Sequence, residues 1–190
     1  MIATDSSEWT ILKMRRLILL RHAKADAHSA GGDRQRPLTK RGEEDARRVG
    51  RYLAEEGLVP DLAVSSDARR AKRTLDLALE AFPREVSHRL DDAIYLADPD
   101  RLLDLLRETP AETATLLAIG HNPGFADLAS ALATDGSPDA LSRLRSKYPT
   151  AALAVLDLEA DDWSAVGAGG ARLERFVTPG DLRGGGDEPD

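Results

Sequence analysis

Apolar positions along this chain form short runs that alternate with longer amphipathic stretches. Residues 17–20 are a continuous apolar run, long enough for a strand that is buried on both faces. After Thr39, a good helix-capping residue, apolar side chains recur at helical spacing, and Gly57 stands where helices commonly end. The pattern therefore predicts a strand over 17–20 and a helix from Thr39 to about Glu56.

The same alternation continues along the rest of the chain. Further strands are predicted over residues 62–64, 115–119, 151–156 and 173–177. Helices are predicted along the apolar stripes that begin at Ala68 and Phe125 and in the leucine-rich stretch 101–107. Repeated strand-then-helix order is typical of an α/β fold with a mainly parallel sheet and helices on both faces.

The chain is expected to form one domain between two segments of different character. Its 190 residues are an ordinary length for a single domain. Residues 1–13 are polar and aperiodic, so we expect the folded domain, and the native product itself, to start near Met14. Residues 179–190 hold three consecutive glycines among acidic residues, which predicts a flexible tail. The predicted domain spans residues 14–178.

Composition and charge exclude several classes of function. A net charge of -7 argues against a general nucleic-acid binder, whose surface is expected to be basic. The chain has no apolar run of about 18 residues, so no membrane span is predicted. It contains no cysteine, which excludes disulfides and thiolate chemistry, and it begins without a secretion signal. We expect a cytoplasmic protein.

Residues whose side chains can take part in catalysis or ligand binding follow three of the predicted strands. They are Arg21 and His22 after the first, Ser66 and Arg70 after the second, and His121 and Asn122 after the third. Because the carboxyl ends of parallel strands open onto one side of a sheet, these residues are expected to meet there. Guanidinium groups match the oxygens of a phosphoryl group, and a neutral imidazole is a nucleophile toward phosphorus. The spacing therefore predicts a phosphate pocket that needs no metal ion.

Four segments resemble the histidine phosphatase (phosphoglycerate mutase-like) superfamily. They are Arg21-His22-Ala23, with alanine where glycine is usual, then Arg36-Pro37-Leu38-Thr39, the stretch 65–74, and Gly120-His121-Asn122-Pro123-Gly124. The last three look more specifically like the SixA-type branch, the phosphohistidine phosphatases. The resemblance covers about residues 14–178. It implies a three-layer α/β/α sandwich around a mostly parallel sheet, and a family that needs no cofactor.

The resemblance assigns roles by motif. His22 matches the phosphorylated nucleophile, Arg21 and Arg70 match the two phosphate-binding arginines, and His121 matches the second pocket histidine. Larger relatives carry an acidic proton donor before an aromatic position, and Asp92 falls nearest to that place.

Three more residues are candidates for substrate binding. Arg36 and Ser66 are expected near the pocket mouth, where loop ordering or helix capping would explain them equally well. Asn122 stands where phytase-like relatives have an aspartate, which argues against that branch.

The resemblance implies a metal-independent phosphatase whose substrate is phosphohistidine on a signalling or phosphotransfer protein. One alternative is a phosphatase for small phosphate esters, in which Asp92 would matter greatly because alkoxide leaving groups need a proton. A mutase is less expected, because the chain leaves little room for the insertions that enclose a mutase substrate. A third alternative is a phosphate-binding module that has lost turnover.

Overall fold

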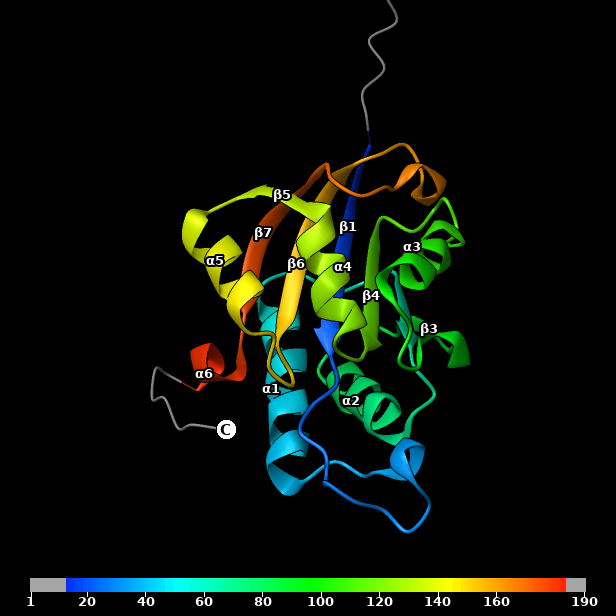
Figure 1. Ribbon diagram of the computed structural model, residues 1–190, viewed down its shortest axis with the longest axis vertical. Coiled ribbons are helices and arrows are strands. Elements are labelled where there is room, and N and C mark those ends of the chain that lie inside the picture. Colours follow the sequence, from blue (N-terminus) through cyan, green and yellow to red (C-terminus); the bar gives the residue numbers. More distant parts are fainter. Residues whose placement is uncertain (1–12, 184–190) are drawn as a thin grey trace, which may run out of the picture.

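A seven-stranded sheet runs through the middle of the molecule in the computed structural model, which describes residues 13–183 (Figure 1). Its strands lie in the order β3-β2-β4-β1-β6-β7-β5. Their bounds are β1 Met14–Arg21, β2 Leu62–Ser65, β3 Ser87–Leu90, β4 Thr115–Gly120, β5 Ala133–Gly136, β6 Leu153–Glu159 and β7 Ala171–Val177. Among these strands only β6 runs antiparallel to its neighbours, so the prediction of a mostly parallel sheet is confirmed.

Helices cover both faces of this sheet. They are α1 Lys40–Glu55, α2 Arg69–Leu79, α3 Pro99–Arg107, α4 Gly124–Leu132, α5 Pro138–Ser146 and α6 Pro179–Leu182, with short 3₁₀ turns η1 Asp33–Gln35, η2 Asp92–Ile94 and η3 Trp163–Ala165. None of the described helices is long and apolar enough to cross a membrane.

Strand β1 shows why the fold has three layers. Leu17 and Leu19 pack into a core shared with α3, α4 and α5. Ile18 and Leu20 point the other way, into a second core shared with α1 and α2. Successive side chains of a strand point to opposite faces, so a continuous apolar run needs helices on both sides. The predicted three-layer α/β/α sandwich is therefore confirmed.

The predicted helix after Thr39 is present with both of its end signals. The Thr39 hydroxyl oxygen accepts a hydrogen bond from the Gly42 amide at 3.0 Å and caps α1. Gly57 follows the helix with φ of 67°, the left-handed conformation that glycine adopts most easily. The cap and the glycine thus fix the helix ends.

The strand predicted over 151–156 is wrong at its start, because β6 begins at Leu153. Ala151 has a φ of 58° and its amide donates to the carbonyl groups of Arg21 and His22, both at 3.1 Å. These residues form a turn next to the end of β1 before the strand begins. Three further elements, β3, β5 and α5, were not predicted.

The predicted flexible tail is also wrong in its first residues. Thr178 forms a capping box with Asp181 and starts α6 directly after β7. Beyond this helix, the Arg183 guanidinium donates two hydrogen bonds to the buried Asp45 carboxylate of α1, at 3.1 and 2.7 Å. The end of the chain is thereby fixed to α1 as far as Arg183. Residues 184–190, and the predicted extension except Lys13, lie outside the described residues.

Candidate active site

The carboxyl ends of three neighbouring strands carry the predicted site residues. Arg21 at the end of β1 lies opposite Gly120 of β4, and Ser65 at the end of β2 lies opposite Ile119. His22 and His121 are therefore at the same level, and Ser66 is level with Gly120. His22 and His121 are buried, and their ring centroids lie 5.0 Å apart. The structure brings the two imidazoles together as the sequence predicted.

Arg70 connects the two imidazoles. Its side chain is 3% exposed, its Nε donates to His22 Nε2 at 3.1 Å, and its Nη2 lies 3.3 Å from His121 Nδ1. Thr74 fixes the helix turn that carries Arg70, because its hydroxyl donates to the Arg70 carbonyl at 2.7 Å and accepts from the Ala23 amide at 3.0 Å. Helix α2 is thus tied to the end of β1 with Arg70 between the histidines.

The partners of the two imidazoles determine where their protons lie. Arginine only donates hydrogen bonds, so the ring nitrogens that face Arg70 carry lone pairs. His22 therefore donates from Nδ1 to the Ala23 carbonyl at 2.8 Å. His121 donates from Nε2 to the Ser66 hydroxyl at 2.9 Å. Both rings are held as neutral tautomers, with their acceptor nitrogens facing the same guanidinium.

Burial and positive neighbours keep both imidazoles neutral. Burial is the main cause that lowers the pKa of His22 to about 3, with further contributions from His121, Arg70 and Arg21. Burial likewise lowers the pKa of His121 to about 4, and Arg70 is the next cause. At neutral pH Nε2 of His22 therefore carries a lone pair, which can attack an electrophile once the hydrogen bond from Arg70 Nε is given up.

Arg21 and Asn122 meet at a carbonyl on the border of the site. Arg21 Nη1 and Asn122 Nδ2 both donate to the Tyr148 carbonyl, at 2.9 and 2.8 Å. Within the part of the chain that the structure describes, the buried Oδ1 of Asn122 has no hydrogen-bond partner. The Tyr148 ring is buried under this contact, and its hydroxyl donates to the Leu19 carbonyl of β1 at 2.5 Å.

Gly120, the last residue of β4, has no room for a side chain. A Cβ at this position would lie 2.3 Å from the ring of Phe125 and 2.9 Å from Ile94. Any larger residue would displace the start of α4, and His121 with it.

The remaining predicted residues differ in their positions. Ser66 is buried and contacts His121 directly, as described above. Arg36 lies in the loop before α1, where it donates to the Asp26 carbonyl at 2.5 Å and to Asp33 Oδ1 at 2.8 Å. Arg36 thus orders this loop, and it is connected to the imidazoles only through Asp33 and Arg70.

Asp92 does not reach the cluster. It begins η2 with its side chain exposed, and within residues 13–183 its carboxylate makes no hydrogen bond or ion pair. The adjacent Asp91 uses its carboxylate to cap η2 through the Ala93 amide at 3.0 Å. The structure therefore gives no support to Asp92 as the proton donor.

Two residues that the sequence did not single out lie at the site instead. Asp33, from η1, accepts from Arg70 Nη2 at 2.9 Å and from the Tyr95 hydroxyl at 2.5 Å, both through Oδ2. The Tyr95 ring lies edge-on to His121, with centroids 5.3 Å apart. Asp33 stands three residues before Arg36, but a polar residue in this loop carries no pattern that would have identified it.

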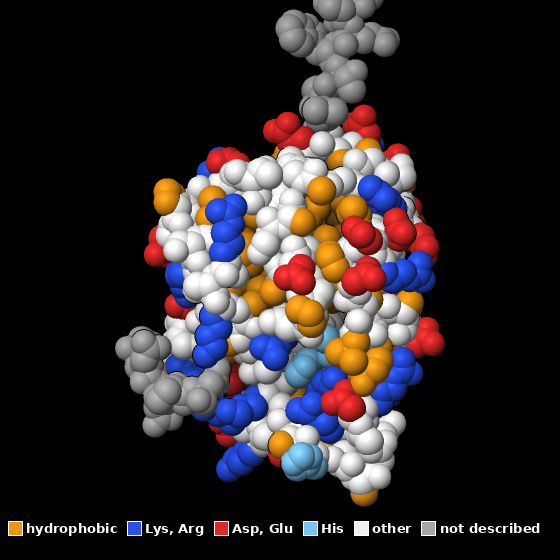
Figure 2. All heavy atoms as spheres, viewed as in Figure 1, with side chains coloured by type: hydrophobic (Ala, Val, Ile, Leu, Met, Phe, Trp, Pro, Cys, Tyr) orange, Lys and Arg blue, Asp and Glu red, His pale blue; other side chains and the backbone are white. Residues whose placement is uncertain are grey.

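Cationic side chains surround the site. Figure 2 shows Lys and Arg gathered around the histidines in the lower half of the view, whereas most acidic side chains lie in the upper half. Arg34 lies over the Tyr95 ring, 4.4 Å from its centroid. On α2, Arg69 and Lys72 are exposed and form no ion pair with any described residue. The net negative charge of the chain is thus distributed away from this face.

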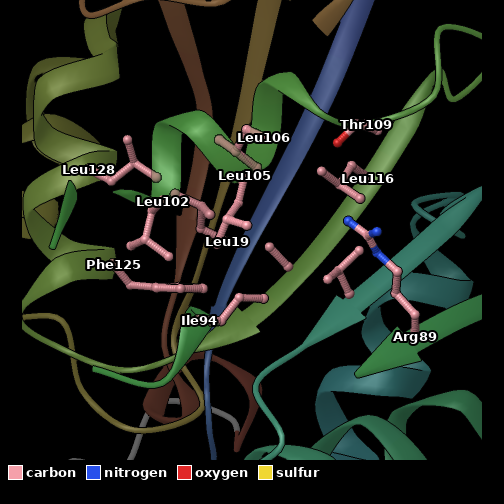
Figure 3. A pocket seen from close by; sticks show the side chains of 12 residues that line it. Leu19, Arg89, Ile94, Leu102, Leu105, Leu106, Thr109, Leu116, Phe125 and Leu128 are labelled. Carbon is pink, nitrogen blue, oxygen red and sulfur yellow. The ribbon is translucent and has the colours of Figure 1, made fainter. Parts of the chain in front are cut away.

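Another hollow in the described part of the molecule is apolar and unsuited to charged chemistry. Figure 3 shows an apolar crevice between α3 and the sheet, lined by residues such as Leu102, Leu105 and Phe125. Its volume of about 20 Å³ holds roughly one water molecule. Within the described residues, no group of three or more His, Asp and Glu side chains is placed to hold a metal ion.

Known proteins resemble this chain in sequence and in fold. Residues 17–95 match the model of the histidine phosphatase superfamily, branch 1. An uncharacterized protein of Mycobacterium tuberculosis is 33% identical over 162 residues, which cover 84% of this chain and 99% of the relative.

Two solved structures extend the match to the whole fold. A protein from Nakamurella multipartitia, assigned as phosphohistidine phosphatase SixA, is 30% identical with a TM-score of 0.74 over 87% of this chain and 96% of its own. The protein histidine phosphatase SixA complexed with tungstate is 21% identical, with a TM-score of 0.72 over 88% of this chain and 99% of its own, and shares the fold. This chain therefore belongs to the histidine phosphatase superfamily.

Proposed function

We propose that this chain is a phosphatase in which Nε2 of His22 takes the phosphoryl group from the substrate. The observation that carries the proposal is the state of this ring. Its Nδ1 proton is held by the Ala23 carbonyl, and its Nε2 lone pair faces the Arg70 guanidinium. A phosphoryl group entering here meets a neutral nucleophile and a cation within about one hydrogen-bond length of each other.

The reaction has two steps. In the first, the Arg70 Nε–H turns from His22 Nε2 to a phosphoryl oxygen, and Nε2 attacks phosphorus in line. The N–P bond forms, and the bond from phosphorus to the leaving group breaks, with its electron pair going to the leaving group. In the second, water attacks phosphorus, the N–P bond breaks, and inorganic phosphate is released with the Nε2 lone pair restored. Arg70 and Arg21 neutralise charge on the phosphoryl oxygens in both steps, and the protein needs no metal ion for this task.

The charge states at the site favour phosphohistidine over an alkyl phosphate ester as the substrate. An alkoxide leaving group needs a proton from an acid. The exposed Asp92 is out of contact, and hydrogen bonds from Tyr95 and Arg36 hold the pKa of Asp33 well below its usual range. Once its other ring nitrogen has taken up a proton from solvent, which imidazole nitrogens do near neutral pH, a phosphohistidine leaves as neutral imidazole. Such a substrate makes the smallest demand on an acid.

The surroundings favour a phosphoryl group that is carried by a protein. Exposed cations on α2 and in the loop before α1 flank the site, and they can contact acidic groups around a phosphorylated side chain. The likeness to the protein assigned as phosphohistidine phosphatase SixA supports the same substrate class. The proposed substrate is therefore phosphohistidine on a signalling or phosphotransfer protein.

Phosphate release from two substrates tests this proposal. The full chain, His22→Ala and Asp92→Asn are each incubated with a phosphorylated histidine-phosphotransfer protein and with an aryl phosphate. We expect the wild type to release phosphate faster from the protein. His22→Ala should lose at least about 10³-fold in rate, because no other group supplies the nucleophile. Asp92→Asn is the matched control and should retain the wild-type rate.

Each alternative predicts a different result. Turnover of the aryl ester alone, combined with a large loss in Asp92→Asn, would establish a small-ester phosphatase. Phosphate binding without turnover of either substrate would establish a binding module. Equal release by wild type and His22→Ala would remove His22 from the mechanism.

A further inference from the structure

Asp33 accepts hydrogen bonds from the outward-facing N–H groups of Arg70 through two groups, its side-chain carboxylate and its main-chain carbonyl. Arg70 Nη1 donates to the Asp33 carbonyl at 2.7 Å, and Nη2 donates to Asp33 Oδ2 at 2.9 Å. The other contacts of this guanidinium go to the two imidazoles. An arginine has five N–H donors, so these contacts engage four of them. Little of Arg70 remains for the oxygens of a substrate.

Three side chains hold Asp33 in this place. Tyr95 and Arg70 donate to Oδ2, while Arg36 Nη1 donates to Oδ1 at 2.8 Å. These hydrogen bonds keep the pKa of Asp33 well below its usual range, so the group is an anion whenever the protein is folded near neutral pH. A carboxylate in contact with Arg70 matches part of the charge and shape of a phosphoryl group.

We propose that Asp33 determines the affinity of this site for phosphoryl groups, because its carboxylate takes the position on Arg70 that a substrate oxygen must take. The inference rests on the proposed function of the His22 site. Substrate then binds by exchange: Asp33 Oδ2 leaves Arg70, and a phosphoryl oxygen accepts the same N–H.

The exposed fractions of the Arg70 and Asp33 side chains indicate which of the two moves in this exchange. The Arg70 side chain is 3% exposed and is tied to both histidines, whereas the Asp33 side chain is 46% exposed. Released from Arg70, the Asp33 carboxylate can be hydrated where it stands, at the surface end of the contact. Arg36 and Tyr95 can keep their bonds to it during a small outward shift of η1. The loop, and not Arg70, is therefore the part that gives way.

Asp33 also affects the net charge of the site. With both imidazoles neutral, Arg21, Arg70 and Asp33 together carry one net positive charge. Replacement of Asp33 by a neutral side chain raises this to two and removes the carboxylate that competes for the Arg70 Nη2 donor. Anions should then bind more tightly.

Calorimetric titration of the full chain with inorganic phosphate and with orthovanadate tests the inference. We expect Asp33→Asn to bind both anions about tenfold or more tightly than the wild type, since the ion pair between the Asp33 carboxylate and Arg70 no longer has to be given up. Tyr95→Phe keeps the carboxylate but removes one of its partners, so a smaller gain is expected. Asp26→Asn is the matched control, because it removes the same charge from an exposed carboxylate of the same loop.

The outcomes separate this inference from the proposed function. Unchanged or weaker binding by Asp33→Asn, with the wild type still binding, would overturn the role of Asp33 and leave the phosphatase proposal standing. An equal gain in Asp26→Asn would overturn it too, since the effect would then be general charge. If neither the wild type nor any variant binds either anion, both the inference and the proposed function fail. Should Asp33→Asn not fold, Tyr95→Phe decides the question by the same comparison.

Discussion

Two buried arginines lie at opposite ends of the sheet and differ in what they contact. Arg15, near the amino end of β1, is 4% exposed and donates to the carbonyl of Thr113 at 3.0 Å and to that of Asp161. Arg70, at the carboxyl ends of β1, β2 and β4, is equally buried, but its partners are two imidazoles and Asp33. Burial alone therefore does not distinguish a structural from a functional arginine.

The difference lies in whether the partners can be exchanged. The main-chain carbonyls of Thr113 and Asp161 are fixed by the fold. Arg15 therefore connects the chain segments around the start of β1 and does not bind a ligand. Arg70 contacts groups that can change partner or accept a phosphoryl group. The carboxyl ends of parallel strands are where such exchangeable groups collect, because the loops that follow the strands supply them.

Substitution of lysine for each of the two arginines tests this difference most directly. Arg70→Lys keeps the charge but loses the planar fork, and we expect kcat/KM for phosphate release to fall by about 10²- to 10³-fold. Arg15→Lys should leave kcat/KM within about twofold but lower the free energy of unfolding by about 1–3 kcal/mol, since carbonyls lose a buried donor. Steady-state kinetics and urea unfolding measure the two effects. Loss of activity by Arg15→Lys, in a protein shown to be folded, would contradict the distinction.

The pH dependence of the free energy of unfolding tests the same comparison, and the expected effect is smaller. The pKa of His121 is about 4 in the folded chain, below the ordinary value of 6.5. Between these values the unfolded chain binds more protons, so stability is complete above about pH 6.5 and is lost as the pH falls toward 4. His121→Gln removes this term, and we expect it to lose about 2 kcal/mol less than the wild type between pH 7 and 4.

Urea unfolding at several pH values measures this difference. Arg15→Lys serves as the control, because no imidazole contacts Arg15 among the described residues, and it should keep the wild-type pH slope. Equal slopes for wild type and His121→Gln would show that His121 is not held neutral by the fold.

Much of the fold and the cluster of basic groups followed from local sequence patterns. The apolar run in β1 predicts burial on both faces, and Thr39 and Gly57 set the ends of α1, because these signals act within a few residues. The parallel strand order then places His22, Arg70 and His121 together without further information.

The elements that were missed lack such local signals. Strand β3 lies at the edge of the sheet and all four of its residues are exposed, so no apolar alternation marks it. Asp33 reaches Arg70 only because the loop before α1 folds back over the start of α2. Contacts that depend on how a loop packs are set by tertiary structure, and this is why the carboxylate at the site is Asp33 and not the Asp92 favoured by motif.

The central claim is that His22 carries the phosphoryl group during turnover. Rapid mixing of the full chain with a phosphorylated phosphotransfer protein, followed by a quench at alkaline pH and mass spectrometry of peptides, tests it directly. The account predicts one acid-labile phosphoryl group on His22 in the wild type and none in His22→Ala. A phosphoryl group on another residue, or turnover with no labelled His22 at any time point, would contradict it.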